Sequence, residues 1–224
     1  MIKNFKVIGV GGIGTILSDL ITRFLNYSGV DSQTVTLVDG DTFEPSNRSR
    51  QVFDELGKKA DIKAEELNGK FNGLVIDSFP HFLTPENIDK VIEEGDLVLS
   101  CLDNHKTRKL ISDKCITLQN VTLISGGNEL IDGNVQVYIR RDGVNLTNPI
   151  THSHPEIQNP EDKSPHELSC QELAETSVPQ IIFTNFTAAA VMGNVFYNIY
   201  SDKYRIVDEI YFDIQTYNHL AKKR

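Results

Sequence analysis

The sequence predicts an α/β fold: one mainly parallel sheet with helices on both faces and an antiparallel extension near the C-terminus. Two observations predict it. Short apolar runs rich in β-branched residues alternate with amphipathic stretches over the first 125 residues, and a period-two run over residues 134–140 follows them. The alternating order favours parallel strands joined by right-handed crossovers. With 224 residues we expect a single domain, residues 1–224.

Each element has its own local signal. Apolar residues at three- and four-residue steps predict the first helix, which Ser28-Gly29 ends, and a continuous apolar run at 97–101 predicts a strand buried on both faces. The period-two strand should be half-exposed and antiparallel. Residues 40–51 are expected as a loop or one helical turn, and 142–168 as a long surface loop that is either functional or disordered. The predicted strands are 5–10, 34–38, 74–76, 97–101, 121–125, 134–140 and 209–214, and the predicted helices are 13–24, 60–68, 85–94, 105–118 and 179–200.

Composition excludes several classes of protein. Apolar residues make up 39%, too many for a chain that is mainly disordered. The balance of 22 basic against 31 acidic residues gives a net charge of −9, which argues against a nucleic-acid binder. Three cysteines cannot build a disulfide framework. We find neither an apolar run long enough to span a membrane nor a signal-peptide pattern, and we therefore expect a cytoplasmic protein.

A glycine-rich turn lies between the first predicted strand and helix. Gly9, Gly11 and Gly14 have the spacing of a Rossmann-like nucleotide-binding turn, which directs backbone N–H groups and a helix N-terminus at phosphate. Asp39 ends the second strand, where a carboxylate accepts hydrogen bonds from ribose hydroxyls. The turn and acid together predict a nucleotide site. The alternative is a tight turn that only lets strand and helix pack closely.

The residues after Asp39 favour a triphosphate over a dinucleotide. Asn47 can donate to a phosphate oxygen, and Arg50 can neutralise phosphate charge with a fixed fork of donors. Lys63, on the next helix, would add a mobile cation. Lys58 and Lys59 compete for that role, spacing does not choose among the three, and all of them fit a solvated helix face as well.

A later strand ends in a carboxylate. Asp103 follows the apolar run at 97–101, so it is expected outside the carboxyl end of a strand, where it could hold Mg²⁺ against phosphates. The alternative is that it caps the helix that starts at His105. The two roles could be divided between Asp103 and Asn104.

Taken together, these motifs resemble the ThiF/MoeB family, bacterial relatives of ubiquitin-activating enzymes. The resemblance runs from about residue 5 to about residue 200. The matching pieces are Gly9-x-Gly11-Gly12-Ile13-Gly14, Asp39-Gly40-Asp41, Ser46-Asn47-x-x-Arg50-Gln51, Ser100-Cys101-x-Asp103-Asn104 with Arg108, Ser125-Gly126 and Gly133-x-Val135. It implies ATP-dependent adenylation of the C-terminal Gly-Gly carboxylate of a small ubiquitin-like or sulfur-carrier protein, by a homodimer that uses ATP and Mg²⁺.

The resemblance also implies residue roles. Asp39 would hold the ribose, Asn47, Arg50 and Lys63 the phosphates, and Asp103 the magnesium ion. Arg50, Lys63, Asp103 and Cys170 would be the catalytic set. The residues expected to contact the nucleotide are Gly9, Gly11, Gly12, Gly14, Asp39, Asp41, Asn47, Arg50, Lys63, Asp103 and Asn104.

The cysteines divide into two kinds. Some family members carry a cysteine at the place of Cys170 that takes the activated acyl group; a thiolate near a helix N-terminus is the better nucleophile, and the alternative is an unreactive thiol. Cys101 and Cys115 lie in an apolar strand and on the apolar face of a helix, and we expect both in the core.

The sequence departs from the family in two ways. It has no Cys-x-x-Cys pair, so no structural zinc is expected, although His152, His154, His166 and Cys170 leave an unusual metal site open. The first strand begins within five residues of Met1, so the N-terminal arginine segment of the family is not expected. This favours, as a second hypothesis, a non-catalytic nucleotide- or protein-binding module of the same fold. An NAD-dependent oxidoreductase is a third, based on the glycine turn alone.

Overall fold

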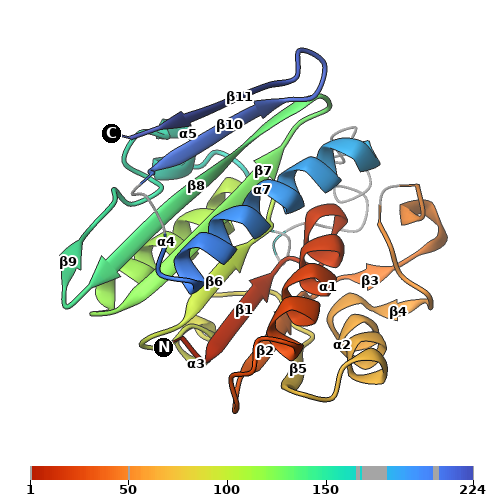
Figure 1. The fold of residues 1–224 in the computed structure, drawn as a ribbon. Helices are drawn as coiled ribbons and strands as arrows, with labels where there is room; N and C mark the ends of the chain where they lie inside the picture. The colour runs from red at the N-terminus through yellow and green to blue at the C-terminus, as the bar shows by residue number, and fades with distance from the viewer. Residues whose placement is uncertain (1, 50, 165–166, 168–180, 204–206, 224) are drawn as a thin grey trace.

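The computed structural model describes residues 2–49, 51–164, 167, 181–203 and 207–223. In this part of the chain nine strands form one central sheet, with helices on both faces (Figure 1), which confirms the predicted fold class. The strands of the sheet are β1 (Asn4–Ile8), β2 (Thr34–Val38), β5 (Val75–Phe79), β6 (Leu97–Ser100), β7 (Val121–Asn128), β8 (Asp132–Arg141), β9 (Val144–Asn145), β10 (Glu209–Asp213) and β11 (Asn218–Lys222). A small separate sheet pairs β3 (Thr42–Phe43) with β4 (Gly57–Lys58). The helices are α1 (Gly12–Asn26), α2 (Lys59–Lys70), α3 (Ile88–Val91), α4 (His105–Thr117), α5 (Pro155–Gln158) and α7 (Ile182–Tyr200), with a 3₁₀ turn η1 (Pro45–Asn47).

The strand order explains where a ligand would bind. Strands β5, β2, β1, β6 and β7 lie side by side and are parallel. The chain lays β2 and β5 on one side of β1 and then returns to place β6 on the other side. The loops after β1 and β6 therefore diverge, and a crevice opens between them at the carboxyl ends of the strands. The glycine turn, Asp39 and Asp103 follow β1, β2 and β6 respectively.

The two faces of the sheet carry separate apolar cores. Helices α1, α2 and α7 cover one face, where Phe5 of β1 packs against Phe196 and Tyr200 of α7, with ring centroids 5.7 and 6.2 Å apart. Helices α3, α4 and α5 supply the core of the other face, for example Ile111 and Ile157, which are fully buried. The apolar spacing that predicted the first helix arises because α1 packs against both the sheet and α7.

Strand β8 is antiparallel to β7 and β10, as predicted, but the expectation that it is half-exposed was wrong. Its central residues 135–139 are buried on both faces. Val135 and Val137 pack into the core beneath α7, whereas Tyr138 packs with Ile150 and Ile157 on the opposite face. The period of two therefore separates two buried faces, because a segment distant in sequence covers the side that looked solvent-exposed.

Other differences come from the segments expected as loops. The stretch 40–51 contains η1, as the expected helical turn, and also β3, whose partner β4 lies 15 residues further on. The stretch 142–168 contains β9 and α5 in its described part, and Ile157 is fully buried, so this part is not only a surface loop. Among the described residues, none of the helices combines the length and apolar character that crossing a bilayer requires.

Candidate functional site

The glycine turn is fixed by main-chain contacts. Gly9 has φ +87°, a left-handed conformation that favours glycine, and its N–H donates to the Val38 carbonyl at 2.8 Å. A Cβ on Gly14 would lie 1.9 Å from the Gly9 carbonyl oxygen, so only glycine lets α1 begin this close to β1. Around Gly11 the space is open, since a Cβ there would meet only the Gln51 side chain, at 3.9 Å. The turn is therefore tightly packed at Gly9 and Gly14 and open at Gly11.

Packing explains why position 12 has no side chain. A Cβ at this position would lie 2.2 Å from Nδ2 of Asn185, a fully buried residue of α7. The same Asn185 accepts a hydrogen bond from Asn128 at the end of β7, at 3.1 Å. Helix α7 thus closes over the start of α1, and the N-cap of α1 is Gly11, which has no side chain to bond the first-turn amides. Helix amides without a side-chain cap suit an anion.

The Asp39 carboxylate organises the turn. One of its oxygens accepts the Val10 N–H at 2.6 Å, and the other accepts the Asp41 N–H at 2.8 Å. Burial raises the pKa of Asp39; the nearby Lys59 ammonium opposes that rise, and the Asp41 carboxylate adds to it. Each carboxylate oxygen has a second lone pair for a ribose hydroxyl. Holding the loop and holding a ribose are therefore compatible for the same side chain.

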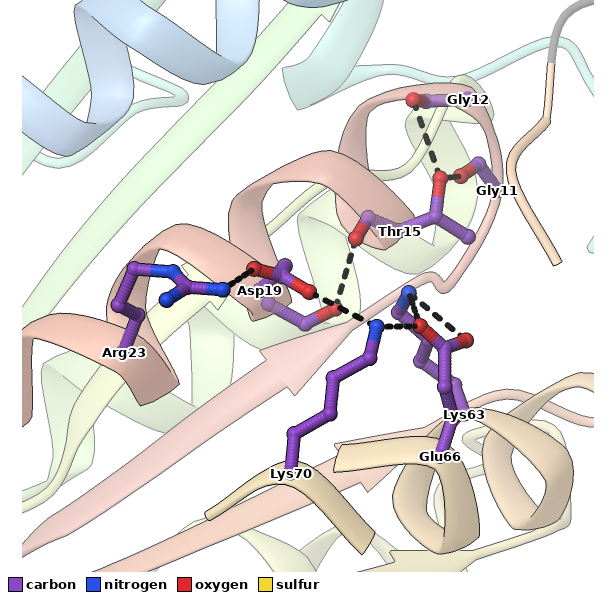
Figure 2. Close-up of polar contacts among 9 residues, drawn as sticks. Gly11, Gly12, Thr15, Asp19, Arg23, Lys63, Glu66 and Lys70 are labelled. Atoms are coloured by element: carbon purple, nitrogen blue, oxygen red, sulfur yellow. Dashed lines mark hydrogen bonds and ion pairs between the residues drawn. The ribbon is translucent and has the colours of Figure 1, made fainter. Parts of the chain in front are cut away.

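The three lysines that the sequence did not separate have different partners. Lys58 is exposed and donates to the Gly40 carbonyl at 2.9 Å, and Lys59 forms an ion pair with Asp41 at 3.0 Å. Lys63 is only 2% exposed and donates to both carboxylate oxygens of Glu66, at 3.0 and 3.1 Å. Lys58 and Lys59 thus hold the loop after β2, whereas Lys63 lies on the side of α2 that faces α1 (Figure 2).

The 3₁₀ turn η1 carries part of the predicted phosphate motif. Asn47 closes this turn, and its side-chain oxygen accepts the Glu44 N–H at 3.1 Å, which leaves its amide N–H₂ as the group able to donate to phosphate. Arg50 lies outside the described residues. Gln51 was not assigned a role from the sequence. It is 5% exposed, it lies against Gly11, and its Oε1 has no hydrogen-bond partner among the described residues. A buried acceptor without a partner beside the open side of Gly11 is consistent with a polar ligand there.

After β6, one residue caps α4 and its neighbour carries the exposed carboxylate. Asn104 is the N-cap of α4, and its Oδ1 accepts the Thr107 N–H at 2.8 Å. Asp162 accepts the other first-turn amides, those of His105 at 2.6 Å and Lys106 at 3.1 Å. Asp103 is exposed, and no hydrogen bond links its carboxylate to another described residue. An exposed carboxylate at the carboxyl end of a strand fits a magnesium ligand, and capping does not compete for it.

Arg108 places a buried positive charge behind Asp103. Its guanidinium donates to Ser125 Oγ at 3.3 Å and to Gln136 Oε1 at 2.8 Å, and the residue is 6% exposed. Burial lowers the pKa of Arg108 to about 10, and the carboxylates of Glu156 and Asp103 oppose that shift. The sequence pointed to Arg108 only through the family motif, because its partners come from β7 and β8.

The other predicted metal ligands were the histidines and the cysteine of the segment 152–170. Within the part of the chain that the structure describes, no group of three or more His, Cys, Asp or Glu side chains is placed to hold a metal ion. His154 instead lies between two carboxylates, with Nε2 2.7 Å from Glu209 and Nδ1 2.6 Å from Glu156. Its possible partners His166 and Cys170 lie outside the described residues.

Cys115 is a core residue, as predicted, whereas Cys101 is partly buried and packs against the edge of the core just after β6. Burial raises the pKa of the Cys115 thiol to about 12, and it raises the pKa of Cys101 further. Both therefore stay protonated near neutral pH and are poor nucleophiles. Cys170, the cysteine expected to react, is outside the described residues.

Known proteins resemble this chain in sequence over most of its length. The model of the ThiF family matches residues 3–216. Adenylyltransferase and sulfurtransferase uba4 of Pyricularia oryzae is 34% identical over 135 residues, which cover 58% of this chain and 26% of that protein. Ubiquitin-like modifier-activating enzyme 5 of Dictyostelium discoideum is 31% identical over 156 residues, which cover 62% of this chain and 39% of that protein. The chain thus spans less than half the length of these curated relatives.

Solved structures resemble it in fold. The crystal structure of E. coli MccB with ATP matches with a TM-score of 0.75 at 17% identity, over 99% of this chain and 63% of that one. MccB with AMPCPP and MccA also matches with a TM-score of 0.75, at 18% identity. At this level of identity the likeness shows the fold, including a mostly parallel sheet followed by antiparallel strands.

Proposed function

Since the chain belongs to the ThiF family, we propose that it is an ATP-dependent adenylyltransferase that activates the C-terminal glycine carboxylate of a small ubiquitin-like or sulfur-carrier protein. The observation that carries this proposal is the arrangement at the carboxyl edge of the sheet. An open glycine turn, the Asp39 carboxylate and the exposed Asp103 carboxylate follow three adjacent parallel strands, on both sides of the crevice. Relatives named adenylyltransferase and ubiquitin-like modifier-activating enzyme support it.

In the proposed reaction, an oxygen of the glycine carboxylate attacks the α-phosphorus of ATP. The bond from that phosphorus to the bridging oxygen of the β-phosphate breaks, and acyl-AMP and pyrophosphate form. Such a transfer depends on orientation and on neutralisation of phosphate charge rather than on a covalent group from the protein. The chain offers orientation through the glycine turn and Asp39, and cations through Lys63 and Arg50.

The individual roles are part of the proposal. The glycine turn (Gly9, Gly11, Gly12 and Gly14) and the 3₁₀ turn that carries Asn47 would surround the phosphates, and Asp39 would bond the ribose. Asp103 would hold Mg²⁺, which supplies charge neutralisation when it is bound. Asp41 and Asn104 would support the site through the contacts they make, with Lys59 and with the first turn of α4. In a second step, the Cys170 thiolate would attack the acyl carbon, form a thioester and release AMP.

ATP–pyrophosphate exchange tests the proposal. The full chain is incubated with ATP, Mg²⁺, labelled pyrophosphate and a small protein that ends in Gly-Gly, and label should enter ATP only when that carrier is present. Asp103→Asn should reduce exchange by about 100-fold or more. The matched control is Asp113→Asn, a 49% exposed carboxylate on α4, the helix that follows Asp103, and it should change exchange by less than about twofold. No exchange with the cognate carrier would refute the proposal.

One observation favours a second candidate, a nucleotide-binding module that does not catalyse adenylation. The cation expected at the phosphates, Lys63, is bonded to Glu66. If this pairing persists with nucleotide bound, the chain would bind ATP without exchange, and no acyl-AMP could be trapped. Binding measured by calorimetry beside the exchange assay separates the two candidates.

We also propose that the chain is a single domain that acts as a homodimer. Apolar side chains remain exposed on the neighbouring helices α1 and α7, namely Leu20 at 45% on α1 and Phe183 at 71% and Phe186 at 48% on α7. An apolar surface of this kind suits a partner protein. Sedimentation of the wild type and of Phe183→Glu tests it: a dimer that becomes monomeric supports this face, and a monomeric wild type refutes the homodimer.

A further inference from the structure

A buried cation lies between α1 and α2, and among the described residues one carboxylate, that of Glu66, bonds it. Lys63 is 2% exposed, and Glu66, one turn later on the same face of α2, accepts from its ammonium at 3.0 and 3.1 Å. We propose that Glu66 is a positioning residue that holds Lys63 away from the phosphates until a triphosphate binds and then releases it. The inference rests on the proposed function, because it gives Lys63 a phosphate to move to.

Glu66 belongs to a chain of charges that runs to the surface (Figure 2). Its Oε1 also accepts a hydrogen bond from Lys70, and Lys70 lies 3.5 Å from Asp19 of α1. Asp19 in turn pairs with Arg23 at 3.6 Å. The exposed fraction is 2% at Lys63, 13% at Glu66, 42% at Lys70, 28% at Asp19 and 58% at Arg23, so the chain is buried at its Lys63 end and open at its Arg23 end. The two helices are thus joined by alternating charges of which Lys63 is the most buried.

This arrangement lowers the cost of releasing Lys63. A buried ion pair is costly to break when one charge is left alone. Here Glu66 keeps Lys70 as a partner after Lys63 leaves, and Lys70 remains tied to Asp19. The ammonium that leaves would gain a phosphate oxygen as a new charge-assisted partner. The exchange therefore needs no unpaired charge in the interior.

The direction of the movement follows from the position of α1. Figure 2 draws the Lys63 ammonium between the Glu66 carboxylate and the first turns of α1. There Thr15 donates to the Gly11 carbonyl at 2.8 Å, in the turn that would cradle the phosphates. The ammonium of a lysine sits on a flexible stem of four methylene groups, so a change of rotamer moves it without moving α2.

The proposal makes two predictions of opposite sign, which isothermal titration of the full chain with MgATP would test. Glu66→Gln keeps the shape of the side chain and removes the competing charge, so the Kd for MgATP should fall, by about tenfold. Lys70→Met leaves Glu66 with Lys63 as its nearest cation, so the Kd should rise, by about three- to tenfold. In a Lys63→Met background both changes should vanish, because the cation through which they act is gone.

The controls separate this inference from the proposed function. Glu65→Gln removes the same charge from the exposed neighbour on α2 and should leave the Kd within about twofold. If Glu66→Gln weakens binding, matches Glu65→Gln, or keeps its effect without Lys63, the positioning role is refuted while ATP binding stands. If the wild type does not bind MgATP, the proposed function itself fails. If Glu66→Gln does not fold, the Kd of Lys70→Met for MgATP decides the question. A Kd of Lys70→Met equal to that of the wild type also refutes the positioning role.

Discussion

The closest backbone approach in the candidate site gives the sharpest prediction about it. In Gly14→Ala, the new Cβ would lie 1.9 Å from the Gly9 carbonyl oxygen and 2.9 Å from the Gly9 carbonyl carbon. Gly9 cannot retreat, because its N–H is bonded to Val38 and the space where its own Cβ would point is filled by Leu102 and the Cys101 carbonyl. The start of α1 must therefore move by about 1 Å or more. Overpacking against rigid backbone costs about 3 kcal/mol, which exceeds the gain of about 1 kcal/mol from alanine in a helix.

Urea and thermal unfolding measure the cost, and a second glycine provides the control. We expect Gly14→Ala to lower the free energy of unfolding by about 2 kcal/mol net and Tm by about 4–8 °C. Gly193, in the middle of α7, has no atom within 4 Å of the position of a Cβ, so Gly193→Ala should raise stability by about 0.5–1 kcal/mol. The displaced turn should also bind MgATP more weakly. If Gly14→Ala is as stable as the wild type, or if the two substitutions have the same sign, the geometry of the turn described above is incorrect.

Three further predictions concern the cap of α4, a buried carboxylate at the amino end of β6, and Cys101 and Cys115. Asn104→Ala should cost about 1 kcal/mol, because the cap on α4 is lost, whereas Asp103→Asn should leave the unfolding free energy within about 0.5 kcal/mol; equal costs in chemical denaturation would return the capping role to Asp103. Burial raises the pKa of Asp96 above its ordinary 3.8. The protonated side chain therefore stabilises the fold below pH 3.8, and this contribution is lost as the pH rises through the raised pKa of the folded state. Asp96→Asn should therefore gain stability relative to the wild type between about pH 4 and pH 7, and denaturation curves in which the variant falls behind over that range would contradict the shift. In a Cys170→Ser variant, Cys101 and Cys115 should react with a maleimide only after unfolding, since burial holds both thiols protonated; rapid labelling of the native chain would show that they are accessible.

The fold was predictable because its signals are local. The period of apolar residues in α1, the continuous apolar run of β6 and the β-branched run of β2 each report how one element meets the core. Strand and helix order then fixed the parallel half of the sheet and the edge at which the glycine turn, Asp39 and Asp103 lie. The mistake at β8 shows the limit of this reasoning. A period of two says that the faces differ, but it does not say that Ile150 and Ile157 will cover one of them.

The glycines of the turn were predictable by residue type, and the bonding partners of the other candidate residues were not. The sequence by itself determined the glycines, because Gly9 and Gly14 meet requirements of the turn in which they stand. Only the tertiary structure decided that Asp162 caps α4 and that Lys63 is bonded to Glu66 in a chain of charges reaching α1. The physical reason is that a hydrogen bond or ion pair depends on distances of a few ångströms between groups. Where those groups lie on different elements, the packing of the whole chain sets these distances, and the spacing of residues along it does not.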